Sequence, residues 1–248
     1  MKISKPTSLP LDKFIEWALY DKNSGYYMKK NPFGKEGDFI TAPNITRLFS
    51  EIIAIWVITF WKSIGSPKKF NLLELGAGNG EMMSVITETL KNFPECFKAC
   101  NFMIHEKSDL LINQQKKKLN SEKILWIKDI KKINTYPTLY LANEFFDAIP
   151  IKQFLKKKEG WVERFVELKN SKKGKFKEQK ANIKKLEKDL NFEISKNQNI
   201  IEYSPETFKY LRSIYNTIGR NDGGLLIIDY GYLNLKMRET LQAVNNHK

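Results

Sequence analysis

The feature that most constrains the fold is an alternation of short apolar segments with helical segments between residues 70 and 142. Four apolar segments read as buried strands, at residues 70–75, 102–105, 124–127 and 138–142. Patterns typical of helices separate the first three, at about residues 81–91 and 109–119. Strands that alternate with helices pair in parallel through crossover helices. The sequence therefore predicts a doubly wound, mostly parallel α/β sheet, whose ligands bind at the carboxyl ends of the strands.

The rest of the chain has less regular patterns. They predict a helix with a turn at residues 8–29 and a long apolar helix, buried on several sides, at 45–61. Further along they predict a hairpin at 153–168, a Lys-rich surface loop at 169–180, a helix at 211–218 and an apolar strand at 225–229. The hairpin and the Lys-rich loop differ in character from the alternating region. Together they predict an insertion at about residues 154–195.

Length and hydropathy limit the class of protein. The chain has 248 residues, of which 42% are hydrophobic, so it can bury a substantial core. No run of about 18 apolar residues could span a bilayer, and no membrane insertion is expected. The amino terminus carries neither a recognisable secretory signal nor a transit peptide. These features predict a cytoplasmic protein of the bacterial type, or a protein of the mitochondrial matrix if the source is eukaryotic.

The formal net charge of +14 raises the question of a nucleic-acid partner. Only five of the 42 basic residues are arginine, the residue that best recognises phosphates and bases. The charge therefore favours a solvated surface over a nucleic-acid partner, and a functional basic surface stays the alternative. Cys96 and Cys100, followed by His105, fall short of the four ligands of a structural zinc site, so no metal is predicted.

A glycine-rich turn follows the first strand of the alternating region. Gly76, Gly78 and Gly80 lack a Cβ, so they allow positive φ and let a ligand approach the backbone. Glu74 precedes the turn, Glu106 ends the next strand, and no Gly-Lys-Ser/Thr follows, which excludes a P-loop. These acids suit a cofactor with an ammonium and a sulfonium better than a pyrophosphate. We expect Glu106 to accept hydrogen bonds from both ribose hydroxyls; a turn that serves only helix–strand packing is the alternative.

Several further motifs occur in a fixed order along the chain. They are Gly25-Tyr26-Tyr27, Pro32-Phe33-Gly34, Gly37-Asp38-Phe39-Ile40-Thr41-Ala42-Pro43, the glycine turn, Ala142-Asn143-Glu144-Phe145-Phe146-Asp147-Ala148-Ile149-Pro150 and Ile228-Asp229-Tyr230-Gly231. In order and spacing they resemble the MidA family of S-adenosylmethionine-dependent methyltransferases, whose mitochondrial members are complex I assembly factors. The resemblance covers about residues 9–247 and implies a class I, Rossmann-like fold. It also implies methyl transfer to arginine of a protein partner, giving symmetric dimethylarginine on a subunit of respiratory complex I.

The block after the fourth strand carries acids that suit an arginine acceptor. A guanidinium is a poor nucleophile, and two carboxylates can grip it and localise its charge on the far nitrogens. We expect Glu144 and Asp147 to do this, with Asn143 holding the methionine moiety or the acceptor. The alternative for the two acids, chiefly for Asp147, is to cap a helix that begins near Phe145.

Other site residues are expected around this centre. The resemblance implies that Asp38, Thr41 and Pro43 form part of a lid over the cofactor. The alternative is that Asp38 and Thr41 cap the helix at Ile45. Asp129 follows the third strand, where a contact with the adenine amino group is expected, and a surface acid is the alternative.

These inferences divide the chain into two domains. Residues 1–65 form a helical region with the cofactor lid, and residues 66–248 form the methyltransferase domain, without the C-terminal part of the family pattern. Glu202 also matches the family but has no chemical role assigned to it. Two other functions stay open: a non-catalytic module that binds a complex I subunit, and an RNA methyltransferase.

Overall fold

The computed structural model describes residues 7–29, 32–34, 37–119, 123–170, 173–233 and 236–242. The chain divides into two compact units, and each is built from separate stretches of sequence. One unit takes its described residues from Lys22–Ala148 and Lys209–Tyr230, and the other takes them from Met1–Asp21, Ile149–Phe208 and Gly231–Gln242. We call them the parallel unit and the antiparallel unit, after the sheets that they contain.

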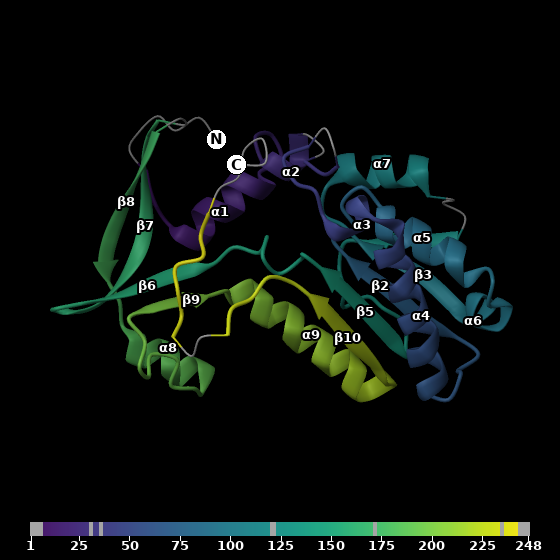
Figure 1. Cartoon of the computed structure of the whole chain (residues 1–248). Helices are drawn as coiled ribbons and strands as arrows, with labels where there is room; N and C mark the ends of the chain where they lie inside the picture. The colour runs from purple at the N-terminus through teal and green to yellow at the C-terminus, as the bar shows by residue number, and fades with distance from the viewer. Residues whose placement is uncertain are drawn as a thin grey trace. The chain divides into compact units, whose positions relative to one another are not determined.

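The parallel unit alternates strands with helices. Its helices are α2 (Tyr26–Lys29), α3 (Ala42–Ile45), α4 (Arg47–Ser63), α5 (Glu81–Leu90), α6 (Pro94–Ala99), α7 (Asp109–Lys118) and the part of α9 (Pro205–Asn221) from Lys209 onward. Its strands are β2 (Phe70–Leu75), β3 (Cys100–His105), β4 (Ile124–Ile127), β5 (Thr138–Asn143) and β10 (Gly223–Ile228). They form one sheet in the order β10-β5-β2-β3-β4, with every neighbour parallel (Figure 1). The parallel pairing that the alternation predicts is confirmed.

Helices cover both faces of this sheet. Phe70, Leu72 and Phe102 belong to a buried core that includes residues of α4 and α5. On the other face, the buried His105 places its Nε2 at 2.9 Å from the hydroxyl of Tyr210 in α9. Figure 1 shows α4 and α5 on one side of the sheet and α9 on the other. Because all strands run in one direction, their carboxyl ends lie on the same side of the sheet. The predicted site residues lie there, at or just after the ends of β2, β3 and β5.

The long apolar helix is interrupted near its start and is less buried than the sequence predicts. Thr46 is extended and separates α3 from α4, which it caps: its Oγ1 accepts a hydrogen bond from the N–H of Leu48 at 3.3 Å. Leu48, Ile52 and Ile55 are 59%, 58% and 49% exposed. The prediction of burial on several sides is therefore wrong, because α4 packs on the sheet only through the face that carries residues such as Val57.

The antiparallel unit has a second sheet. Its elements are β1 (Thr7–Pro10), α1 (Leu11–Tyr20), β6 (Lys152–Lys157), β7 (Gly160–Asn170), β8 (Lys173–Lys180), α8 (Ile183–Leu190) and β9 (Ile200–Tyr203). The strand order is β1-β7-β6-β9, with β8 also paired to β7, and all pairs are antiparallel. The predicted hairpin is present as β6 and β7, and it is the centre of this sheet.

Two small cores stabilise the two faces of the antiparallel sheet. Phe154 and Ile201 pack with Ile183 of α8 on one face. Leu11 of α1 packs with Val166 and other side chains of β7 on the opposite face. The period of two in strand side chains explains this division, because successive residues of β7 point to opposite faces.

The prediction of a loop over residues 169–180 is wrong. β8 pairs with β7 along most of this stretch, while residues 171 and 172 lie outside the described residues. Among the described strands β8 pairs only with β7, so it is an edge strand, and edge strands favour lysines because charge discourages further pairing. Phe176 of β8 packs under the guanidinium of Arg164, at 4.7 Å. The sequence pattern also does not predict the elements β1, α6, α8 and β9.

A polar network holds the segment 236–242 against the antiparallel sheet. The fully buried Gln153 donates to Glu202 at 2.6 Å and accepts a hydrogen bond from Arg164 at 2.7 Å. Glu202 also accepts hydrogen bonds from the backbone N–H of Thr240, at 2.9 Å, and from its hydroxyl. Glu202, to which the sequence assigns no role, thus anchors this segment.

The two units follow other boundaries than a division at residue 65, since they group described residues of 1–21 with those of 149–208. The division at residue 65 stays a prediction. In the described ranges of the chain, the search for a helix long and apolar enough to cross a membrane finds none.

Candidate functional site

The glycine-rich turn between β2 and α5 has the backbone that only glycine adopts easily. Gly76, Gly78 and Gly80 have φ of 67°, 53° and 77°, in the left-handed region. A Cβ on Gly76 would lie 2.8 Å from the ring of Phe145, and one on Gly78 would lie 3.2 Å from the ring of Phe33. The turn therefore needs glycine both for its dihedral angles and because two aromatic rings contact its backbone.

Glu74, at the end of β2, is a buried acid with an unsatisfied oxygen. It is 4% exposed, and its Oε2 has no hydrogen-bond partner among the described residues. Burial, followed by the nearby charge of Glu106, raises the pKa of Glu74 to about 8. A cationic group brought to this oxygen would favour the ionised form. Glu74 is thus suited to a positively charged ligand.

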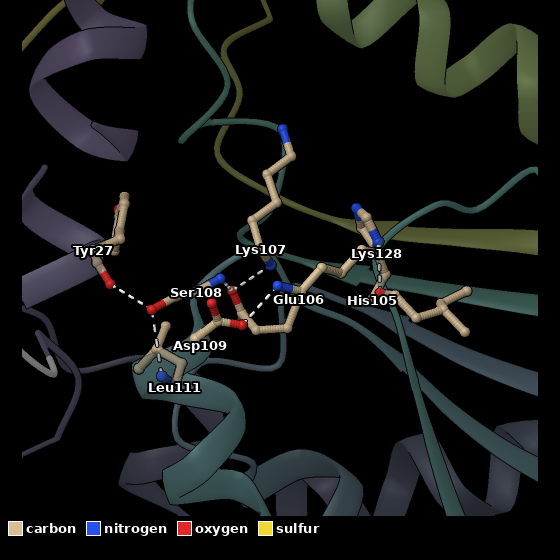
Figure 2. Close-up of polar contacts among 9 residues, drawn as sticks. Tyr27, His105, Glu106, Lys107, Ser108, Asp109, Leu111 and Lys128 are labelled. Atoms are coloured by element: carbon tan, nitrogen blue, oxygen red, sulfur yellow. Dashed lines mark hydrogen bonds and ion pairs between the residues drawn. The ribbon is translucent and has the colours of Figure 1, made fainter. Parts of the chain in front are cut away.

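Glu106 follows β3 and is held in one orientation (Figure 2). It is 8% exposed, and its Oε1 accepts hydrogen bonds from the N–H groups of Lys107 and Ser108, both at 2.9 Å. Its Oε2 lies 3.3 Å from Nε2 of Gln115, which also donates to the carbonyl of Gly78 at 2.8 Å. Burial raises the pKa of Glu106, and these donors oppose the rise. Gln115, which sequence reasoning missed, links this acid to the glycine turn.

Asp129 lies after β4 and is exposed. Its Oδ1 accepts a hydrogen bond from the N–H of Lys131 at 3.0 Å, so the side chain shapes a surface turn. Its charge acts on the pKa of His105, which places it near the ends of β3 and β4. A role toward adenine stays a prediction.

The predicted lid residues surround the glycine turn. Asp38 is 6% exposed and accepts a hydrogen bond from the hydroxyl of Tyr26. Tyr27 stacks on Phe33 with ring centroids 6.0 Å apart, and its carbonyl accepts a hydrogen bond from the hydroxyl of Ser108 at 2.8 Å (Figure 2). Phe33 in turn contacts the glycine turn, so this segment is fastened at two points. Tyr27 and Phe33 belong to motifs of the sequence, but only the structure assigns them these contacts.

Thr41 and Pro43 lie at the start of α3. The hydroxyl of Thr41 accepts a hydrogen bond from Nδ2 of Asn44 at 2.8 Å, and Oδ1 of Asn44 accepts one from Asn79 of the glycine turn at 2.6 Å. Pro43 is buried in the first turn of α3. Thr41 occupies the N-cap position of the short α3, which ends at Ile45, but its side chain makes no capping hydrogen bond there. The long helix α4 is capped by Thr46 and not by Asp38 or Thr41.

The residues after β5 form an acidic turn, which we define as residues 144–148. Glu144 has φ of 47°, and its N–H donates to the carbonyl of Ile228 at 2.8 Å. No helix begins at Phe145, so the capping alternative for Glu144 and Asp147 is wrong. The N–H of Asp147 instead donates to the side chain of Asp229.

The electrostatics of the acidic turn are those of crowded carboxyl groups. Burial raises the pKa of Glu144, and the hydroxyl of Tyr230 lies 3.4 Å from its Oε2. Burial of the carboxyl group, then the charges of Asp229 and Glu144, raise the pKa of Asp147 to about 6, although the residue as a whole is exposed. Near it, Oδ1 of Asn143 is buried and has no hydrogen-bond partner in the described part of the chain.

Tyr27 interacts electrostatically with both the acidic turn and Glu106, the acid expected to bind the cofactor ribose. After burial, the charges of Asp147 and Glu106 are what raise its pKa. The phenol therefore stays protonated and lies in the field of both carboxylates. The structure thus brings Glu74, Glu106 and Asp147 together around one strand edge, and it leaves Asp129 at the surface.

His105 is a packing residue. Burial lowers its pKa to about 4, so the imidazole is neutral near pH 7. The rings of His105 and Tyr210 both contact the ring of Phe145. The ring centroids of Phe145 and Tyr210 lie 5.2 Å apart. Together these rings support the contact between Phe145 and Gly76. Cys96 and Cys100 are both buried and free.

The arrangement fits a cofactor that carries an ammonium, a sulfonium and a ribose. Glu74 offers a buried carboxyl oxygen that needs a donor, and Glu106 offers a carboxylate of fixed orientation for hydroxyl groups. The glycine turn exposes backbone without a Cβ. Among the described residues, no group of three or more His, Cys, Asp or Glu side chains could hold a metal ion.

Known proteins resemble this chain along its length. In sequence, "Protein arginine methyltransferase NDUFAF7, mitochondrial" of Xenopus tropicalis is 26% identical over 271 residues, which cover 100% of this chain and 63% of the relative. The Drosophila melanogaster homologue is 27% identical, with 100% and 62% covered, and the human protein is 26% identical, with 100% and 61% covered. The chain therefore spans less than two thirds of the length of these relatives.

Two solved structures from Burkholderia thailandensis have a similar fold. A protein described as a "likely methyl transferase", bound to S-adenosyl-homocysteine, superposes with a TM-score of 0.69 at 21% identity and covers 84% of this chain and 55% of that chain. A native structure of an uncharacterized protein gives a TM-score of 0.65 at 21% identity, with 84% and 53% covered. At this identity the likeness shows the α/β fold.

A family model assigns the chain to a family. The model described as "Putative S-adenosyl-L-methionine-dependent methyltransferase" matches residues 52–248. This match and the relatives confirm the family resemblance and the cofactor, S-adenosyl-L-methionine, that the sequence predicts. Since the model covers well over half of its length, the chain belongs to this family of S-adenosyl-L-methionine-dependent methyltransferases.

Proposed function

We propose that this chain is an S-adenosyl-L-methionine-dependent methyltransferase that acts on arginine of a protein. The observation that carries the proposal is the acidic turn at the carboxyl end of β5, in the same unit as the glycine turn. Its carboxylates suit a guanidinium. The names of the relatives, protein arginine methyltransferases, support the same acceptor. The MidA resemblance adds the expectation of symmetric dimethylation of a respiratory complex I subunit.

The cofactor would be held by the residues around the glycine turn. S-adenosyl-L-methionine would supply a methyl group on a sulfonium: the bond from sulfur to the methyl carbon breaks as the acceptor nitrogen bonds to that carbon, S-adenosylhomocysteine leaves, and the proton of that nitrogen passes to solvent. We assign Glu74 to its ammonium, Glu106 to the ribose hydroxyls and Asp129 to the adenine, with backbone contacts from Gly76, Gly78 and Gly80. Asp38, Thr41 and Pro43 belong to the lid that excludes water. We also propose that the sheet is the doubly wound sheet of class I methyltransferases.

The acceptor would be held by the acidic turn. Glu144 and Asp147 pair with the guanidinium, and they hold its charge on the nitrogens that do not react. Asn143, whose buried oxygen lacks a partner in the described chain, orients the methionine part or the acceptor. Alignment of the nitrogen with the methyl carbon and stabilisation of charge are what a protein can add to this displacement.

The division of the chain at residue 65 and its location in the cell belong to the same proposal. Residues 1–65 would carry the lid, and residues 66–248 the methyltransferase domain with its insertion. The relatives are named mitochondrial, and cytoplasm of the bacterial type stays our prediction for a bacterial source.

Glu144→Gln tests the proposal. The change keeps the shape of the side chain and removes its charge, so affinity for S-adenosylhomocysteine stays within about twofold while methyl transfer falls by roughly two to three orders of magnitude. Calorimetry measures the affinity, and mass spectrometry measures transfer to an arginine protein or peptide. Glu159→Gln, in the loop between β6 and β7, is the matched control and leaves both values unchanged.

Three results would redirect the proposal. Loss of cofactor affinity with an unchanged rate per bound cofactor would move Glu144 to the cofactor site. Absence of S-adenosylhomocysteine binding to the wild-type chain at millimolar concentration would favour the non-catalytic module. Transfer to RNA, with binding that weakens steeply as salt rises, would favour the RNA methyltransferase.

A further inference from the structure

Asp229 lies where the ends of β5 and β10 meet. The last register pair of these parallel strands joins Asn143 to Ile228, and the N–H of Glu144 donates to the carbonyl of Ile228 at 2.8 Å. The next residue is therefore Glu144 on one strand and Asp229 on the other. The register of the sheet thus brings a third carboxylate to the acidic turn.

Both oxygens of Asp229 are used by the backbone. Oδ2 accepts hydrogen bonds from the N–H groups of Phe146 and Asp147, both at 3.2 Å, and Oδ1 accepts one from the N–H of Tyr230 at 2.8 Å. Glu144, which begins this turn, has a left-handed backbone that non-glycine residues rarely adopt and that the surroundings must maintain. Asp229 supplies that support from the neighbouring strand.

We propose that Asp229 is a positioning residue for the acceptor: it fixes the acidic turn through its backbone hydrogen bonds and adds a third negative charge beside Glu144 and Asp147. This inference rests on the proposed function, because the acceptor is the guanidinium that the turn would hold. Asp229 itself is engaged with three N–H groups, so gripping the guanidinium falls to Glu144 and Asp147.

The third charge has a consequence for Asp147. Burial raises the pKa of Asp147 to about 6, and the charges of Asp229 and Glu144 add to the rise. In the described part of the chain, the titratable groups of other elements that interact with it are Tyr27 of α2 and Tyr230 after β10, and both phenols have raised pKa values, so they stay protonated in the same range. Asp147 therefore changes its charge just below neutral pH.

Only the ionised form of Asp147 pairs with a guanidinium. Acceptor methylation should then fall as pH decreases through about 6, where the free enzyme protonates Asp147. Removing the charge of Asp229 lowers the pKa of Asp147, and this acidic limb should move to lower pH by about one unit.

The first measurement needs no turnover. In the full chain labelled with ¹³C at aspartate carboxyls, NMR titration follows Asp147, whose signal is assigned by its absence in Asp147→Asn. Asp229→Asn keeps one oxygen for the N–H groups of Phe146 and Asp147, at the expense of the hydrogen bond from the N–H of Tyr230, and the Asp147 titration should move down by about one pH unit. Asp222→Asn makes the same change at the opposite end of β10 and should leave the titration in place. An unchanged Asp147 titration in Asp229→Asn would overturn the proposal.

The second measurement is the pH profile of kcat/KM for the acceptor. Asp229→Asn should keep the wild-type plateau above pH 7 with a displaced acidic limb, while Asp229→Ala, which frees the turn, should lose about tenfold or more at every pH. Affinity for S-adenosylhomocysteine should be unchanged in both. A wild-type profile in Asp229→Ala would overturn the positioning role. Absence of arginine methylation by the wild-type chain would instead refute the proposed function, and the NMR titration separates these two failures.

Discussion

At the scale of single residues, the buried carboxyl group of Glu74 makes the free energy of unfolding of the ligand-free protein depend on pH. Its folded pKa of about 8 is above the ordinary value of 4.5, because burial disfavours the charged form. A group of this kind contributes stability that is fully present below its unfolded pKa and is lost as pH rises through its folded pKa. The relevant window therefore runs from about pH 4.5 to pH 8.

Glu74→Gln should remove this dependence. Across that window the free energy of unfolding of the wild-type chain should fall, relative to the variant, by at most about 1.4 kcal/mol per pH unit. Urea denaturation at pH 5.5, 7 and 8.5 measures the difference. Glu95→Gln, a change at an exposed acid of α6, is the control. Parallel pH curves for wild type and Glu74→Gln would mean that Glu74 is ionised without cost in the folded chain.

At the scale of elements, hydrophobic patterns in the sequence predict those helices and strands whose formation does not depend on contacts with distant parts of the chain. The parallel strands could be predicted because each is a short apolar run, and the three inner strands β2, β3 and β5 are buried along almost their whole length. β8 could not, because an edge strand needs little apolar character and its lysines conceal the period of two. The break at Thr46 was also missed: an apolar pattern runs through it, and only the extended backbone at this residue separates α3 from α4.

The candidate site divides in the same way. The glycines and acids of the turn could be predicted because their chemistry requires specific residue types at fixed spacing. The contacts of Phe33 and Phe145 with these glycines could not, because aromatic residues carry no spacing signal for a distant partner. Asp229 lies in a matching motif, yet its role depends on which strand lies next to β5, and that order is a property of the whole sheet.

The cap of α4 offers a test at this scale. Thr46→Ala removes the side-chain acceptor for the N–H of Leu48 and should lower the free energy of unfolding by about 1 kcal/mol. Thr59→Ala makes the same change inside the same helix, where Thr59 bonds only to the carbonyl of Ile55 and alanine is the better helix former. Thermal or urea denaturation compares them. Equal stability of the two variants would show that the cap contributes nothing.

At the scale of the whole molecule, each unit has a sheet and a hydrophobic core of its own. A ligand that binds only one of them stabilises that unit by RT ln(1 + [L]/Kd), about 2.7 kcal/mol at one hundred times Kd. All predicted cofactor residues lie in the parallel unit.

Hydrogen exchange with S-adenosylhomocysteine at one hundred times its Kd should distinguish the units. Amides of β2, β3 and β5 that exchange by unfolding of the parallel unit should slow by about 100-fold, which corresponds to that stabilisation. Amides of β7 and β8 serve as the internal control and should keep their rates. Equal slowing in both sheets would mean that the chain unfolds as one cooperative unit, and no slowing in β2, β3 and β5 would contradict a cofactor site there.

The pairing of β5 with β10 has a further consequence during synthesis of the chain. β5 is complete once Asn143 has been translated, but its outer neighbour is made only after β6 to β9 and α9. On the ribosome, the outer edge of β5 therefore stays unpaired, in addition to the edge at β4, until β6 to α9 have been made. An open edge of this kind invites pairing with other chains. Slow translation between β6 and α9 would prolong that exposure. A chaperone that covers strand edges would prevent pairing of β5 with other chains during this interval.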